Sequence, residues 1–138
     1  MDRPFSNALK CLQDVGLRPT RQRLALAKIL FDQPHHHVTA EVLHQQVSES
    51  GAKVSLATIY NTLHQFTEAN LLKEVIVDAN RTYFDTNMND HHHIYFKDEE
   101  TLRDISADDL VISALPDVPT GKKISGVSVV VHMENDDV

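Results

Sequence analysis

The chain has 138 residues, of which 41% are hydrophobic and 24% charged, and this composition is typical of a soluble globular protein rather than a disordered one. No apolar run approaches the roughly 18 residues of a membrane span, and the opening Met-Asp-Arg-Pro lacks the apolar segment of a signal peptide, so we expect a cytoplasmic protein without a membrane segment. Cys11 is the only cysteine, which excludes an internal disulfide and a structural zinc site built from four cysteines.

The net charge of −7 is unevenly distributed along the chain. Residues 1–88 hold 9 basic and 9 acidic side chains, whereas residues 89–138 hold 4 basic and 11 acidic ones. Within residues 3–31 the balance is 6 basic to 1 acidic. Because the short-range field governs contact, such a basic stretch can bind a polyanion although the whole chain is acidic. Overall acidity therefore does not exclude nucleic acid.

Apolar residues at helical spacing predict four helices in the first half of the chain, over residues 5–15, 21–31, 40–50 and 56–69. Thr20, Thr39 and Ser55 precede the last three and are the expected N-caps, while Gly16, Gly51 and Asn70 are expected to end the first, third and fourth. The side chains predicted to face the core are Phe5, Ala8, Leu9, Leu12, Leu24, Ala27, either Leu30 or Phe31, Leu43, Val47, Leu56, Ile59, Leu63 and Phe66.

The pattern then changes to β-structure. Segments 72–77 and 81–85 predict a hairpin around a short turn, residues 87–90 predict a linker, and segments 93–96 and 102–105 predict two further strands. Ser106 is expected to cap a short helix that ends before Pro116. Alternating valines predict a final strand over residues 123–133.

Helices followed by a two-stranded ribbon are typical of a winged helix-turn-helix, in which the helix at 56–69 enters the major groove of DNA and the hairpin is the wing. The sequence thus predicts an α+β protein with a winged-helix DNA-binding domain over residues 1–86 and a small α/β dimerisation domain over residues 87–138. The second segment is too small for a substantial core, and an unpaired valine-rich strand is an aggregation hazard. Pairing with a second copy solves both problems, so we expect a homodimer.

A cationic turn precedes the helix at 21–31. The side chains that lie off the apolar face of the helix at 56–69 are Ser55, Thr58, Tyr60, Asn61, Thr62 and Gln65. Such side chains contact phosphates and base edges, although a solvated helix surface would explain the polar face of the helix alone equally well. The cationic turn favours DNA, because an arginine beside a proline suits a narrow minor groove. The expected DNA-binding residues are Arg18, Arg21, Arg23, Ser55, Thr58, Tyr60 and Asn61, and duplex DNA is the expected partner.

Two motifs carry a family resemblance. Residues 16–23, Gly-Leu-Arg-Pro-Thr-Arg-Gln-Arg, and residues 55–63, Ser-Leu-Ala-Thr-Ile-Tyr-Asn-Thr-Leu, resemble the opening signature and the recognition helix of the ferric uptake regulator family. The wing that ends Tyr-Phe-Asp at 83–85 and the histidine triplet after it also fit. The resemblance implies a dimeric, metal-responsive transcription regulator, not an enzyme. It further implies that Tyr60 contacts thymine and that Arg18 enters the minor groove.

The histidines indicate a metal site. His91 and His93 are two residues apart in an incipient strand, so their side chains point the same way, and two imidazoles with carboxylates suit Zn, Fe or Mn. A solvated loop or a cloning tag are the plain alternatives. The resemblance implies a regulatory site at this position, with ligands at His37, Asp85, His91, His93 and Asp104. A metal held there is expected to set the hinge between the domains and hence the half-site spacing on DNA.

The departures from the family are informative. Phe96 and Glu99 occupy the places of the family's zinc-binding Cys-x-x-Cys, and Val111 and Val127 replace two ligands of a further metal site, which leaves Asp90 and His92 without metal-binding partners. Absent cysteines and a histidine triplet resemble the iron response regulator branch, which senses haem. Cys11 is followed by leucine, so the Cys-Pro haem motif of some members is missing. Haem would then be held by His91, His92 and His93, with His37, His44 or His64 as further candidates.

Three functions without catalysis follow as hypotheses, and one enzymatic alternative is weighed against them. The first is a regulator of iron or haem homeostasis genes that responds to haem or to a divalent metal, and the second is a metal-only regulator of iron, manganese, zinc or peroxide response. A metal-buffering protein is the third, and it would leave the polar surface of the helix at 56–69 unexplained. A zinc hydrolase built on His91, His93 and Asp85 lacks a paired general base and an enclosed pocket in the sequence.

Overall fold

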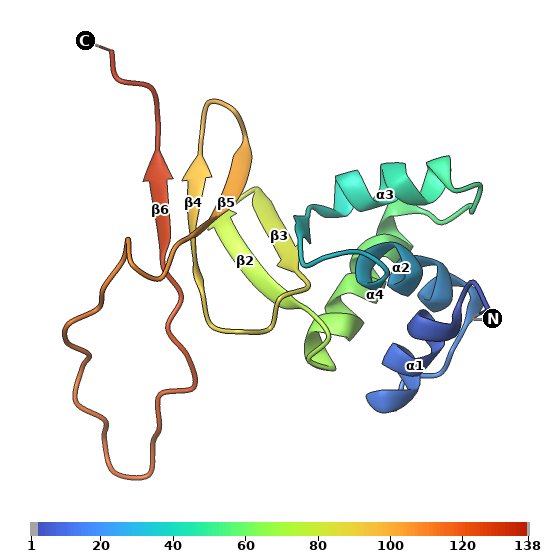
Figure 1. The fold of residues 1–138 in the computed structure, drawn as a ribbon, viewed down its shortest axis with the longest axis horizontal. Helices are drawn as coiled ribbons and strands as arrows, with labels where there is room; N and C mark the ends of the chain where they lie inside the picture. Colours follow the sequence, from blue (N-terminus) through green and yellow to red (C-terminus); the bar gives the residue numbers. More distant parts are fainter. Residues whose placement is uncertain (1–2, 138) are drawn as a thin grey trace. The chain divides into compact units, whose positions relative to one another are not determined.

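The computed structural model describes residues 3–137 and has the α+β architecture that the sequence predicts. Helices precede strands along the chain, apart from one short strand between the second and third helices (Figure 1). The helices are α1 (Ser6–Asp14), α2 (Arg21–Phe31), α3 (Ala40–Glu49) and α4 (Leu56–Glu68). The strands are β1 (His37–Val38), β2 (Lys73–Asp78), β3 (Arg81–Asp85), β4 (His92–Phe96), β5 (Thr101–Ile105) and β6 (Val130–Met133).

The three predicted N-caps are present. The side-chain oxygens of Thr20, Thr39 and Ser55 accept backbone N–H bonds from the residue three positions on, at 3.2 Å in each case. Gly16 and Gly51 follow α1 and α3 with φ of +74° and +91°, a region that glycine enters at little cost. Local hydrogen-bonding chemistry therefore sets where these helices begin and end.

The chain folds as two compact units, an N-terminal unit that ends at Met88 and a C-terminal unit that starts at Asn89. The core of the N-terminal unit is aliphatic around Phe66 and Phe84, and most of the predicted inward residues are buried in it. Phe5 and Leu56 are exceptions, with 45% and 37% of their surfaces exposed, because both lie at the first turn or edge of their helices. Thr62, predicted to lie on the polar face of α4, is buried instead.

The sheet of the N-terminal unit has the strand order β1-β3-β2, and all its pairs are antiparallel. The predicted hairpin is β2 and β3, and β3 has the predicted bounds. The sequence predicts a loop over Pro34 and the histidine triplet at 35–37, yet His37 and Val38 form β1, with His37 opposite Asp85 and Val38 opposite Phe84. This pairing joins residues almost 50 positions apart, so no local pattern indicates it.

The sheet of the C-terminal unit has the order β5-β4-β6, with β5 antiparallel and β6 parallel to β4. The prediction of a helix after Ser106 is wrong. Residues 107–109 form one turn, in which the Asp109 N–H donates to the Ser106 carbonyl at 2.9 Å, and the chain then runs irregularly to β6 (Figure 1). An isolated short helix is marginal, and Val111, the start of its apolar side, is 80% exposed.

The final strand is predicted over residues 123–133 but occupies only Val130–Met133. A strand persists only where a neighbouring strand satisfies its backbone hydrogen bonds, and the pairing of β6 with β4 starts at Val130. Among the described residues, no helix is long and apolar enough to cross a membrane.

Candidate functional site

Three of the expected DNA-binding side chains, Ser55, Thr58 and Asn61, lie at the start of α4. Ser55 caps the helix and also donates its hydroxyl to the Thr58 hydroxyl at 2.9 Å. Asn61, one turn further on, is exposed to solvent. Polar atoms at a helix N-terminus combine with its positive dipole end, so this surface suits phosphate oxygens and base edges.

Arg18 and Arg23 lie beside α4 around one groove of about 400 Å³, together with Thr58 and Asn61. The groove is also lined by Thr20, Gln22, Thr62 and Gln65. The structure thus brings four of the seven expected DNA-binding residues to one place. Arg21 and Ser55 are exposed but do not line this groove, and Tyr60 lines a neighbouring hollow.

The guanidinium of Arg23 is engaged within the protein. Its Nε and Nη2 donate to Oε1 of Gln65 at 3.2 and 3.0 Å, and its Nη1 donates to the Arg18 carbonyl at 3.0 Å. Arg23 therefore links two parts of the chain, the turn that contains Arg18 and the helix α4. Gln65 is expected from the sequence only as part of a polar helix face, because its partner is 42 residues away.

Tyr60 is held by a residue that the sequence did not single out. Its hydroxyl donates to Oε1 of Glu41 at 2.6 Å, and its ring stacks on His64 with centroids 6.5 Å apart. The hydrogen bond from Tyr60 lowers the pKa of the Glu41 carboxyl, and the same bond raises the pKa of the phenol. Glu41 precedes Tyr60 by 19 positions and lies on another helix, so only the fold brings them together.

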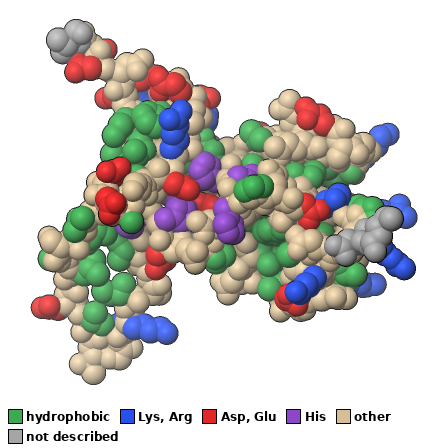
Figure 2. Space-filling model, viewed as in Figure 1, with side chains coloured by type: hydrophobic (Ala, Val, Ile, Leu, Met, Phe, Trp, Pro, Cys, Tyr) green, Lys and Arg blue, Asp and Glu red, His purple; other side chains and the backbone are tan. Residues whose placement is uncertain are grey.

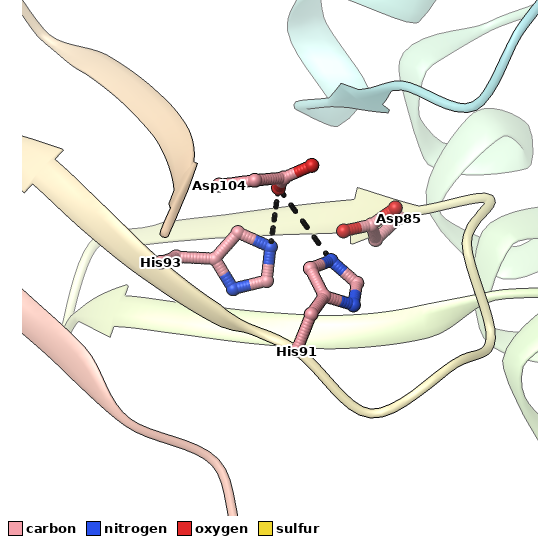
Figure 3. A group of neighbouring side chains, drawn as sticks. All are labelled: Asp85, His91, His93 and Asp104. Carbon is pink, nitrogen blue, oxygen red and sulfur yellow. Dashed lines mark ion pairs between the residues drawn. The ribbon is translucent and has the colours of Figure 1, made fainter. Parts of the chain in front are cut away.

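The C-terminal unit contains a cluster of possible metal ligands, His91, His93 and Asp104, and Figure 3 shows both rings pointing to Asp104. Nε2 of His91 and Nε2 of His93 lie 3.5 and 3.3 Å from the same carboxylate oxygen, Oδ1. His93 and Asp104 are cross-strand neighbours on β4 and β5, while His91 precedes β4.

The hydrogen bonding of His91 favours a cation between these groups. Its Nδ1 lies 2.6 Å from the Asn89 carbonyl, which can only accept, so Nδ1 carries a proton. In the neutral ring Nε2 is then a lone-pair atom facing the Asp104 carboxylate, which is the ligand form of histidine. Ligand bonds of about 2.0–2.2 Å place the donor atoms of a tetrahedral zinc about 3.3–3.6 Å apart. The observed spacings of 3.5 and 3.3 Å lie in this range, so the residues fit a divalent metal.

The other two predicted ligands belong to the N-terminal unit. His37 on β1 and Asp85 on β3 are cross-strand neighbours. Asp85 is buried, and its Oδ1 accepts the Asn87 N–H at 2.9 Å. The ring of His37 lies edge-on to Tyr83, with centroids 5.8 Å apart. Each unit therefore presents its own imidazole and carboxylate side by side.

His92 has a role that the sequence did not predict. Its Nδ1 accepts the Val129 N–H at 3.1 Å, and the His93 N–H in turn donates to the Val129 carbonyl at 3.1 Å. The sequence leaves His92 without metal-binding partners, and in the structure its ring binds the peptide that leads into β6. In the neutral ring Nε2 then carries the proton and offers no lone pair.

The sequence is similar to known regulators. The family model "Ferric uptake regulator family" matches residues 14–131. The "Peroxide-responsive repressor PerR" of Staphylococcus epidermidis is 33% identical over 94 residues, which are 68% of this chain and 62% of that protein. The "Ferric uptake regulation protein" of Legionella pneumophila is 35% identical over 81 residues, which are 59% of this chain and 60% of that protein. The chain thus spans less than two thirds of the length of these relatives.

Solved structures share the fold. The Vibrio cholerae ferric uptake regulator has a TM-score of 0.71 at 22% identity, with 91% of this chain and 98% of that chain covered. The Pseudomonas aeruginosa ferric uptake regulator, solved with manganese, has a TM-score of 0.71 at 21% identity, with 94% and 98% covered. The family model covers most of the sequence and the fold agrees with it, so the chain belongs to the ferric uptake regulator family.

Proposed function

We propose that this protein is a metal-responsive transcription regulator that binds duplex DNA as a homodimer. The observation that carries the proposal is that one chain has both a surface suited to DNA and a group of side chains suited to a metal ion. A winged-helix unit gathers arginines and polar side chains at α4, and a second unit aims two imidazoles at one carboxylate. A metal buffer explains only the second of these features, and a hydrolase explains neither α4 nor its arginines.

The names of the relatives support a repressor function. The Staphylococcus epidermidis protein is named a peroxide-responsive repressor and the Legionella pneumophila protein a ferric uptake regulation protein. Both match this chain at 33–35% identity. We propose that Arg18, Arg21, Ser55, Thr58, Tyr60 and Asn61 contact DNA. Arg23 contacts DNA as well, and it also holds the turn that contains Arg18 in place for its contact.

We further propose that one divalent ion, Fe, Mn or Zn, is held by His91, His93 and Asp104 together with His37 and Asp85. Only five residues separate Asp85 from His91, which limits the distance between them to about 20 Å and leaves a shared site within reach. A shared ion would fix the orientation of the two units, and with it the spacing of the two DNA-binding surfaces in a dimer.

Haem is the alternative ligand, as in the iron response regulator branch. The donor set favours a divalent ion, because a carboxylate lies against both imidazoles and carboxylates are rarely haem ligands. His92 in its observed hydrogen bond offers no lone pair, so haem at the triplet would rely on His91 and His93. We therefore propose metal as the primary signal and treat haem as an outcome to be tested.

For the dimer, we propose that a second copy covers the segment between β5 and β6. This segment exposes apolar side chains over much of its length, and hydrophobic side chains are visible there in Figure 2. The exposed members are Val111, Ile112, Leu115, Val118 and Ile124. Exposed apolar surface of this extent marks an interaction site in a folded protein.

The test is selection of duplex DNA from a randomised pool by the metal-loaded protein, followed by gel shifts of the selected duplex and its scrambled control. We expect tighter binding to the selected duplex with Mn²⁺ or Zn²⁺ and weaker binding after chelation. Release on addition of haem alone, with no effect of metal, would replace the metal hypothesis by the haem hypothesis. Failure to enrich any duplex under all these conditions would contradict the proposed function.

A further inference from the structure

Tyr60 of α4 is held at two points of its side chain in the N-terminal unit. The hydroxyl donates to Oε1 of Glu41, in the first turn of α3, at 2.6 Å. The ring face stacks on His64 one turn later, with an interplanar angle of 24°. His64 is itself held edge-on against Phe84 of β3, with centroids 5.9 Å apart. A side chain that is 36% exposed is thus confined by two other residues, Glu41 and His64.

The carboxylate of Glu41 is ionised at neutral pH and interacts with two neighbouring side chains. The Tyr60 hydrogen bond and the positive charge of Arg81 both lower its pKa. Arg81 begins β3, so this charge comes from the wing. Glu41, Tyr60 and Arg81 line a hollow of about 240 Å³, together with Thr39, Asn80 and Thr82. The start of α3, the start of α4 and the turn of the wing therefore converge on Tyr60.

We propose that Glu41 is a positioning residue for sequence recognition: its carboxylate takes up the hydrogen bond of the Tyr60 hydroxyl and holds the ring so that the ring, rather than the hydroxyl, meets the DNA bases. This inference rests on the proposed function. An aromatic ring suits apolar contact with the thymine methyl group in the major groove. The hydroxyl, already committed to Glu41, is not needed for that contact.

Holding the Tyr60 side chain in place raises specific affinity, because the side chain is already ordered in the free protein and loses no further conformational entropy when DNA binds. Immobilising one flexible side chain at an interface weakens binding by about threefold to tenfold. A tyrosine fixed beforehand avoids this loss, but only on duplexes that offer the right base. Glu41 should therefore raise the ratio of specific to non-specific affinity, although its own charge repels phosphate.

Three variants separate positioning from charge. Glu41→Ala removes the acceptor and the charge, whereas Glu41→Gln removes the charge and keeps an amide oxygen that accepts the same hydrogen bond. Tyr60→Phe removes the hydroxyl and keeps the ring. Glu49→Ala, which removes an exposed carboxylate from the other end of α3, is the matched control.

The measurement is the ratio of affinities for the duplex selected by the wild type and for its scrambled version. We expect Glu41→Ala to lower the ratio about threefold to tenfold, while Glu41→Gln and Glu49→Ala keep it near the wild-type value. Tyr60→Phe should lose as much as Glu41→Ala, and the double variant should lose no more than either. Thermal unfolding of each variant checks that it is folded.

Several results would overturn the inference. If Glu41→Ala and Glu41→Gln change the ratio alike, charge and not hydrogen bonding is the cause. If the losses of Tyr60→Phe and Glu41→Ala add in the double variant, the hydroxyl contacts DNA by itself. An unchanged ratio in Glu41→Ala denies the residue any role in recognition.

A DNA-free measurement separates this inference from the proposed function. Ultraviolet titration of the phenols, with Tyr60→Phe to assign the signal, should show a lower pKa for Tyr60 in Glu41→Ala than in the wild type. Equal values would show that the hydrogen bond is absent in solution and would overturn the inference. If the hydrogen bond is present but no duplex is ever selected, the proposed function fails together with the recognition role.

Discussion

At the residue scale, the arginines expected to contact DNA differ in what they already bind. Arg23 uses three donors on Gln65 and on the Arg18 carbonyl, so its guanidinium has fewer donors left for phosphate. It contributes to recognition by fixing the Arg18 turn against α4. Arg21 is exposed at the start of α2.

Tyr60→Ala should lower specific DNA affinity by about 1–3 kcal/mol, because base contacts are lost, and should change non-specific affinity little. Binding of the selected and scrambled duplexes, measured by fluorescence anisotropy, checks this. Equal losses on both duplexes would remove Tyr60 from direct readout.

His91 and His93 should be needed for ligand response. The sequence suggests that both imidazoles are exposed and can be removed together at little cost, but His93 is only 2% exposed. The test therefore uses His91→Ala and the larger, polar His93→Gln rather than two alanines. Each should bind DNA as a folded protein and lose the effect of added metal, because the differential binding energy that biases one state is gone.

Gel shifts with and without Mn²⁺ measure this response, and His35→Ala, which removes an exposed histidine of the other triplet, is the control. Asp85→Ala should act in the same direction for a metal site and do little if haem alone is sensed. A His91→Ala protein that still responds to both metal and haem would show that the sensor lies elsewhere.

At the element scale, α1 and α2 are joined by Asp32, which follows α2. Its carboxylate accepts from Asn7 Nδ2 at 3.0 Å and from Lys28 Nζ at 2.8 Å. The Lys28 bond first, and then the Asn7 bond, lower the pKa of Asp32. A lowered folded-state pKa means stability that is present above the ordinary aspartate pKa of about 3.9 and lost as pH falls through the folded-state value.

We therefore expect the free energy of unfolding to fall on acidification below about pH 4, and to fall less in Asp32→Asn. The difference should be under about 1 kcal/mol, because the group is solvent-screened. Urea unfolding between about pH 3 and pH 7 measures it, a range that spans the ordinary aspartate pKa. An identical pH profile in the two proteins would show that the α1–α2 contact contributes nothing through this carboxylate.

The peptide of Val129 is held on both sides, by the ring of His92 and by the His93 N–H. Val129 lies in the segment that we propose a second copy covers. Val129→Asp should therefore weaken the proposed dimer by about 3 kcal/mol or more, because the second copy would bury the new charge without a partner. Sedimentation velocity measures the change, and the neighbouring exposed Ser128→Asp is the matched control. A folded, unaltered dimer in Val129→Asp would place the interface elsewhere.

At the scale of the whole molecule, the proposed dimer should not depend on metal. One cysteine cannot build a structural zinc site of four, and the exposed apolar side chains between β5 and β6 offer a hydrophobic interface instead. Protein dialysed against a chelator, with its metal content measured, should sediment as the metal-loaded protein does. A monomer after chelation would show that metal holds the chains together.

Local patterns in the sequence were enough for α1 to α4, their caps, the hairpin β2–β3 and the strands β4 and β5. A threonine or serine before an apolar helical stretch satisfies the first free N–H groups, which is a matter of three or four neighbouring residues. The same holds for Asn70, whose φ of 63° follows the end of α4, because asparagine tolerates this region better than most residues. Strand alternation likewise predicts that His91 and His93 point the same way, and both rings lie against Asp104 although His91 itself precedes β4.

Tertiary structure decided what neighbours in the sequence cannot. β1 forms because β3 pairs with it, and the helix expected after Ser106 is absent because its apolar side has nothing in the described chain to pack against. Glu41 meets Tyr60 and His92 meets Val129 across 19 and 37 positions. The sequence alone determined most of the elements and the ligand-type side chains. Long-range pairing decided which side chains share a hydrogen bond, because such contacts form only when distant segments close on one another.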